Sequence, residues 1–180
     1  QTSGYDWARP HGDWQSRLHW IVLAFVPSSL LLGITQFYTT DIAAFPLLWV
    51  IPLAVYLLTF VIVFARRPII SHRVMVWIQP ILLMPLALWF LWRFGESVFT
   101  VFMVHLVGLF AATMVCHGEL ARTRPAASRL TEFYLLLSLG GVLGGVFNAL
   151  VAPLIFDSVI EYPLALGLAC LLMPARRGLV

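Results

Sequence analysis

His105 is the side chain of this sequence best placed to do chemistry inside a membrane. It lies at the centre of an apolar run, residues 97–115, that contains no other ionisable group. Such a residue could bind a metal, ligate a haem or pigment, or relay protons, with Gln79 as a polar neighbour. The alternative is a neutral ring hydrogen-bonded to Gln79, to Thr59 or to a carbonyl freed by a proline. A haem held by two histidines needs a second histidine at the same depth. Because the sequence offers none, we favour the structural role and predict no cofactor.

A second group, Cys116, His117 and Glu119, follows at the end of the same run. All three side chains are possible metal ligands. However, neighbouring side chains point about 100° apart on a helix, and the sequence has no second ligand pair with CxxC or HxxxH spacing. We therefore predict no metal site here, and interpret the group as a helix end at the membrane surface, paired with Arg122 or Arg129.

Sequence signatures of catalysis are missing from the chain. There is no GxSxG, no HExxH, no P-loop and no glycine fingerprint that follows a strand. We therefore expect that this chain is not an enzyme. A catalytic domain would have to lie on another part of a longer protein or on a partner.

The elements that must position these residues are apolar helices. The composition is 61% hydrophobic and 11% charged, and the mean hydropathy is +0.94. A bilayer core about 30 Å thick needs roughly 20 apolar residues of helix. Hydrophobicity within each run is continuous, which excludes the alternating pattern of barrel strands. We predict an all-α transmembrane bundle over residues 17–180, preceded by a polar tail, residues 1–16. Its six spans are residues 18–38, 43–64, 74–92, 97–115, 133–156 and 162–173, of which the last is short.

The basic residues predict the orientation of these spans. All eleven are arginines, and only Arg93 would lie on the second side of the membrane. The positive-inside rule places the arginine-rich side in the cytoplasm. We therefore expect an N-in, C-in multi-pass membrane protein. Arginines in short loops suit anionic lipid headgroups or partner subunits, whereas their scatter argues against nucleic acid. These contact residues are Arg66, Arg67, Arg73, Arg122, Arg124 and Arg129.

Small residues in the run 133–156 predict close packing of this helix against another. Residues four apart share a helix face, and missing side chains there let a second backbone approach. An asparagine on the same face can add an interhelical hydrogen bond. The partner helix could belong to this chain or to another. The predicted packing residues are Gly140, Gly141, Gly144, Gly145, Asn148, Ala149 and Ala152.

Tryptophan and tyrosine positions predict two belts at the membrane surfaces, because amphipathic rings prefer that depth. Trp20 and Trp77 lie near one end of their spans. The opposite belt would hold Tyr38, Trp89, Trp92 and Tyr162. Trp49 and Tyr56 fit better as fillers of the bundle core.

Two stretches, residues 24–67 and 116–156, resemble a known family. The second is the more specific, through its CHGELA, TEFYL and SLGG segments. Together they resemble the membrane portion of bacterial fused major-facilitator-like/spermidine synthase proteins, over about residues 17–173. In that family a cytoplasmic aminopropyltransferase-like domain usually follows and further spans precede. Because neither is in this sequence, the resemblance implies a membrane module of the bacterial inner membrane and transfers no catalytic residue. The chain starts at Gln and stops just after a span, so we expect a fragment or processed product.

The function predicted from the sequence is that of a non-catalytic scaffold or accessory subunit within a larger membrane assembly. One alternative is a permease-like domain for a small molecule or polyamine. Against it, no Asp or Glu lies at mid-membrane, and residues 65–73 lack the Gly-Asp-Arg-Gly-Arg pattern of true major-facilitator proteins. Another alternative is a redox or pigment-binding subunit that uses His105. The predicted partners are the lipid bilayer and other membrane subunits.

Overall fold

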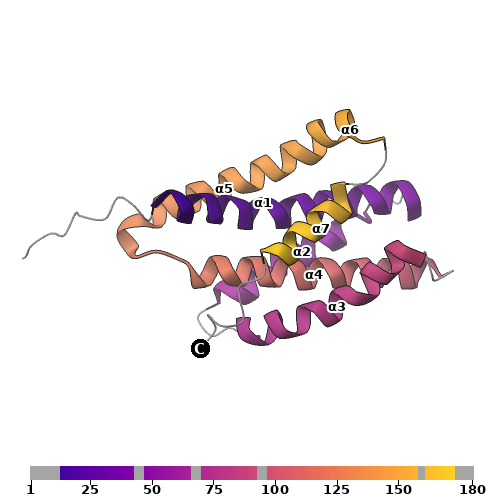
Figure 1. The fold of residues 1–180 in the computed structure, drawn as a ribbon, viewed down its shortest axis with the longest axis horizontal. Coiled ribbons are helices and arrows are strands. Elements are labelled where there is room, and N and C mark those ends of the chain that lie inside the picture. The colour runs from indigo at the N-terminus through magenta and orange to yellow at the C-terminus, as the bar shows by residue number, and fades with distance from the viewer. Residues whose placement is uncertain (1–12, 43–46, 66–69, 93–96, 158–160, 173–180) are drawn as a thin grey trace, which may run out of the picture.

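The computed structural model describes residues 13–42, 47–65, 70–92, 97–157 and 161–172, and their regular structure is all helical (Figure 1). Six helical rods follow one another along the chain. α1 (Asp13–Phe37) continues as a π-helical turn, Tyr38–Ile42, and is followed by α2 (Val50–Phe64), α3 (His72–Trp92) and α4 (Val98–Arg122). A short 3-10 turn, Ala127–Arg129, leads into α5 (Leu130–Val146), which continues through a π-helical turn, Phe147–Val151, into α6 (Ala152–Ile155). α7 (Glu161–Leu171) is the last rod.

Four of these rods are long and apolar enough to cross a bilayer: Trp14–Thr40, His72–Trp92, Val98–Arg122 and Ala127–Ile155. The chain therefore has the character of a multi-pass helical membrane protein. α2 and α7 have only 15 and 11 residues. At 1.5 Å per residue they extend about 22 Å and 16 Å, short of a core of about 30 Å.

Four of the six predicted spans are confirmed as long apolar helices, and the other two correspond to shorter apolar helices in the described residues. The predicted span 162–173 corresponds to α7, whose described part is too short to cross alone. The predicted span 43–64 begins within residues 43–46, which lie outside the described residues, and its described helix starts at Val50. The polar tail up to residue 12 and the C-terminal residues 173–180 also lie outside them.

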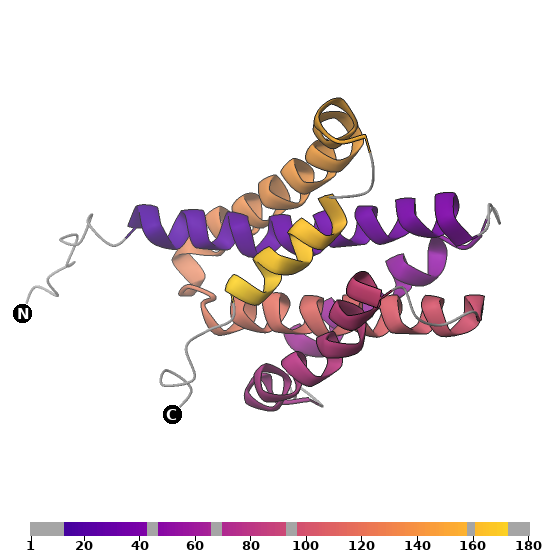
Figure 2. The ribbon, with the colours of Figure 1, turned by 45° about the vertical axis from the view of Figure 1, so that its right-hand side comes forward.

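α1 and α4 form the centre of the bundle, side by side and antiparallel (Figure 1). α5 packs along α1, while α2 and α3 pack on α4. α7 crosses α1 and α4, and α5 diverges from α1 as it approaches α6 (Figure 2). Successive rods alternate in direction. We call the two ends of the bundle the Arg122 end, where α1, α3 and α5 begin, and the Thr40 end, where α1 and α3 finish.

The core lies between α1, α3 and α4, where large apolar side chains are buried. Leu23, Leu30, Leu86 and Leu109 are all at most 1% exposed. The outer face of α5 is instead apolar and exposed, as a lipid-facing helix requires. Its exposed residues include Leu135, Leu139, Val142, Leu143, Val146 and Leu150.

The predicted aromatic belts are only partly correct. Trp77 and Trp92 are exposed on α3, in keeping with the prediction. The other four belt residues, Trp20, Tyr38, Trp89 and Tyr162, are at most 6% exposed and pack inside the bundle. Trp49, expected in the core, is 47% exposed. The reason is geometric, because the position of a ring along a helix does not reveal which way the ring points around it.

Candidate functional site

Among the described glycines, Gly140 and Gly144 of α5 approach the backbone of another helix, α1, most closely. A Cβ added at Gly144 would lie 2.6 Å from the carbonyl oxygen of Phe25 and 3.0 Å from Ser28 Cβ. One added at Gly140 would meet the carbonyl oxygen of Ile21 even more closely. Only glycine allows the two backbones to come this near.

The neighbouring glycines face elsewhere. A Cβ at Gly141 would have no neighbour within 4 Å, and one at Gly145 would touch only Leu32, at 3.8 Å. Ala149 is exposed, whereas Ala152 is buried. The predicted packing residues therefore divide between two faces of the helix, and Gly140, Gly144, Asn148 and Ala152 lie on the inner face.

Hydrogen bonds of polar side chains stabilise the contact between α1 and α5. Ser28 Oγ donates to the carbonyl oxygen of Gly141 over 2.8 Å. Asn148 Nδ2 donates to Ser29 Oγ over 2.6 Å and to the carbonyl oxygen of Gly144 over 3.0 Å. Asn148 thus forms the interhelical hydrogen bond predicted for it.

His105 is fully buried in a cluster of aromatic rings drawn from α1, α3 and α7. Its Nδ1 lies 3.0 Å from the hydroxyl of Tyr162, in hydrogen-bond contact. Its ring stacks on Phe37 at a centroid distance of 4.3 Å, and Trp89 meets it edge-on at 4.5 Å. The predicted partners Gln79 and Thr59 are wrong. Tyr162 was missed because it lies 57 residues away.

Thr59 serves a different histidine. Its hydroxyl donates to the carbonyl oxygen of Tyr56 over 2.7 Å and lies 3.0 Å from Nδ1 of His117. A threonine hydroxyl has one proton. That proton is directed to Tyr56, so His117 Nδ1 acts as the donor to Thr59. Gln79 is buried in α3, and its side-chain amide forms no hydrogen bond within the described ranges.

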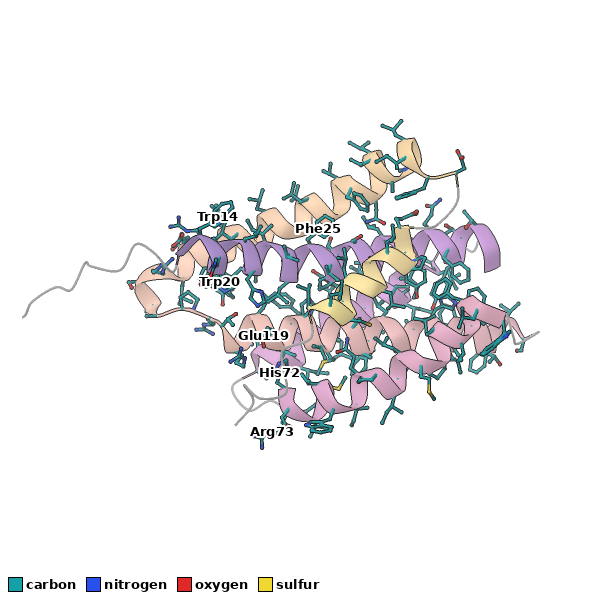
Figure 3. All side chains as sticks on the ribbon, viewed as in Figure 1. Trp14, Trp20, Phe25, His72, Arg73 and Glu119 are labelled. Carbon is teal, nitrogen blue, oxygen red and sulfur yellow. The ribbon has the colours of Figure 1, made fainter. Side chains whose placement is uncertain are left out.

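Glu119 is the centre of an ionic cluster at the Arg122 end (Figure 3). Its side chain is only 4% exposed. Arg122 Nε donates to Glu119 Oε2 over 2.9 Å, and Nε2 of His72 on α3 lies 3.2 Å from the same oxygen. The predicted partner Arg122 is therefore correct. Arg129 instead pairs with Glu132, which also accepts a hydrogen bond from Arg17 of α1.

The other members of this group are dispersed. Cys116 is a buried free thiol, and His117 points to α2 rather than to Glu119. Among the described residues, no cluster of three or more His, Cys, Asp or Glu side chains is arranged to hold a metal ion.

Five arginines, Arg17, Arg73, Arg122, Arg124 and Arg129, lie on elements that meet at the Arg122 end. Arg73 points outward there from the first turn of α3 (Figure 3). Arg66 and Arg67 fall outside the described residues. An exposed basic rim of this kind suits anionic headgroups.

At the Thr40 end the structure contains a cavity that sequence reasoning missed. Its volume is about 840 Å³, within the range of small-molecule pockets. Four elements contribute to its wall: the end of α1, the end of α3, the α5–α6 region and the start of α7. Polar lining residues include Thr35, Gln36, Thr40, Asn148, Asp157 and Glu161. The sequence signal was a pair of acidic residues, Asp157 after α6 and Glu161 at the start of α7.

Comparison of the chain with protein-family models, curated proteins and solved structures finds no match. The resemblance to fused synthase proteins therefore stays a prediction.

Proposed function

We propose that this chain is a non-catalytic membrane scaffold, a helical module within a larger membrane assembly. The observation that carries the proposal is the division of the glycine stripe on α5. Gly140 and Gly144 hold α5 against α1, whereas Gly141 and Gly145 lie on a side with almost no neighbour in the described structure. A helix surface of small and exposed apolar residues permits close approach of a second membrane helix.

The proposed topology has the Arg122 end in the cytoplasm of a bacterial cell. The basic rim at that end supports it, because arginines are enriched on the cytoplasmic side of inner-membrane proteins. The alternating direction of the six rods supports N-in and C-in termini. α2 and α7 would complete the set of six spans as short helices sheltered by longer neighbours. The resemblance to the membrane part of fused synthases agrees with such a module.

Partner association can be tested with two matched substitutions. Gly144→Leu is expected to disrupt the α1–α5 contact and with it the fold. Gly141→Leu is expected to leave the fold intact and remove partner subunits, as measured by native mass spectrometry after extraction in mild detergent. A wild-type chain that purifies as a lone monomer and transports substrate in liposomes would contradict the scaffold role.

The topology can be tested by labelling single cysteines in whole cells. Cys170 is exposed and would react, so the background carries Cys170→Ser, while buried Cys116 stays. Thr40→Cys is expected to react with an impermeant maleimide from outside, and Ser71→Cys or Ala126→Cys only after the cells are opened. The reverse pattern would overturn the proposed orientation.

A second candidate function is small-molecule binding, which the cavity at the Thr40 end favours. The third possibility, a redox or pigment-binding subunit, receives less support. The ring of His105 is stacked on Phe37 and bonded to Tyr162. These contacts account for the histidine as a packing and hydrogen-bonding residue.

A further inference from the structure

The cavity at the Thr40 end contains a buried carboxylate. Glu161, the first residue of α7, is 8% exposed and lines the cavity wall. It forms no hydrogen bond or ion pair with any other residue in the described part of the chain. Burying an ionised carboxylate without a partner is costly. The amino-terminal dipole of α7 offsets part of that cost, and a bound cation would offset more.

The other polar groups of the cavity add acceptors and negative charge. Asp157 lies exposed on the lining, near the start of α7. The amide nitrogen of Asn148 donates to Ser29 and Gly144, whereas its Oδ1 has no hydrogen-bond partner in the described residues. No arginine or histidine is found among the described lining residues. The described lining therefore carries two carboxylates and no positive charge, and its hydrogen-bond donors are neutral groups such as the Gln36 amide and the Tyr162 hydroxyl.

The remaining wall is aromatic. Phe37, Trp89, Phe90 and Tyr162 contribute to it from three helices. Phe90 and Tyr162 lie with ring centroids 5.7 Å apart. Aromatic rings provide apolar contact area and attract cations to their faces. This wall suits the carbon skeleton of a ligand whose charged end reaches Glu161.

We propose that this cavity binds a primary ammonium group attached to an apolar body, with the ammonium at Glu161. A primary ammonium carries three N–H donors, which suit the carboxylate oxygens of Glu161 and Asp157 on the lining. A quaternary ammonium would satisfy the charge but none of the hydrogen bonds. The same chemistry is found in a free amine and in the ethanolamine headgroup of a lipid, both of which can reach a cavity at the end of a membrane bundle.

Binding is tested with the full chain in detergent micelles, titrated calorimetrically with 2-phenylethylammonium chloride. The neutral analogue 2-phenylethanol and the trimethylated quaternary analogue serve as comparison ligands. We expect the primary ammonium to bind at least about tenfold more tightly than either comparison ligand. A tenfold difference in affinity corresponds to the contribution of one charge-assisted hydrogen bond. Glu161→Gln should reduce ammonium affinity at least about tenfold and leave 2-phenylethanol unaffected.

Two further variants make the result interpretable. Glu132→Gln is the same substitution at the opposite end of the bundle, and should keep wild-type affinity. Asp157→Asn changes an exposed residue, so it reports on cavity charge even where Glu161→Gln fails to fold, and should weaken ammonium binding. The proposal is overturned if 2-phenylethanol binds as tightly as the ammonium, if no ligand binds, or if the cavity variants bind like wild type.

The source of the ammonium is distinguished in nanodiscs. Native mass spectrometry would identify a lipid headgroup if the wild type retains phosphatidylethanolamine and Glu161→Gln does not. Phosphatidylcholine should not replace the retained lipid. Binding of the soluble amine with no retained lipid would identify a free amine. Because the cavity variants leave Gly141 untouched, loss of ammonium binding with partner subunits still bound would separate this site from the scaffold role.

Discussion

Replacing Gly144 by alanine should separate α5 from α1, although it adds a single methyl group. The new Cβ would lie 2.6 Å from the carbonyl oxygen of Phe25, whereas an ordinary contact begins at 3.4 Å. The two backbones must therefore move apart by about 0.8 Å at this point. Ser28 now donates to Gly141 over 2.8 Å. The same movement would lengthen this bond beyond normal hydrogen-bond distance.

The size of the effect follows from these changes. Overpacking costs about 1–3 kcal/mol, and each weakened interhelical hydrogen bond in a membrane about 0.6 kcal/mol. Alanine regains up to about 1 kcal/mol relative to glycine through its helix propensity. We expect Gly144→Ala to lower the free energy of unfolding by about 1–3 kcal/mol.

Gly141→Ala is the matched control, because it makes the same chemical change three residues away. A Cβ there meets nothing within 4 Å, so this variant should be as stable as wild type or slightly more so. Stability is measured by unfolding in detergent–denaturant mixtures, followed by circular dichroism and tryptophan fluorescence. Equal stability of the two variants, or a larger loss at Gly141, would refute the assignment of these faces.

Three further predictions concern the buried polar groups. Tyr162→Phe and His105→Phe should each lower the free energy of unfolding by about 1 kcal/mol, and the double variant should lower it by less than their sum. The absorption spectrum should be unchanged in every variant. Strictly additive losses would contradict the hydrogen bond between the two side chains. Thr59→Val should strand the Nδ1–H donor of His117 and cost about 1–3 kcal/mol in the same unfolding assay, whereas Thr39→Val, at an exposed site, serves as the neutral control. Glu119→Gln should cost about 1 kcal/mol even at high salt, because the carboxylate is buried; a loss abolished by salt would contradict that burial.

What the sequence determines about this protein is the position of each group along a helix. The cost of burying charge in lipid acts on each residue separately, so apolar runs can be recognised one by one. The long apolar helices His72–Trp92 and Val98–Arg122 lie where their runs predict. Glycines four apart likewise indicate close packing without knowledge of the partner. The ion pair between Glu119 and Arg122 also follows from their spacing of three residues on one helix.

The tertiary structure alone decides which direction each side chain takes around its helix axis, and hence what it meets. Gly140 and Gly141 are neighbours in sequence, yet a Cβ would collide with α1 only at Gly140. Trp89 and Trp92 lie one turn apart, and only Trp89 packs beside His105. All-round hydrophobic helices carry no polar stripe to indicate an inner face, since lipid and protein core are equally apolar. The cavity around Glu161 is likewise a product of tertiary structure, because the end of α1, the end of α3 and residues 148–163 must converge before its wall exists.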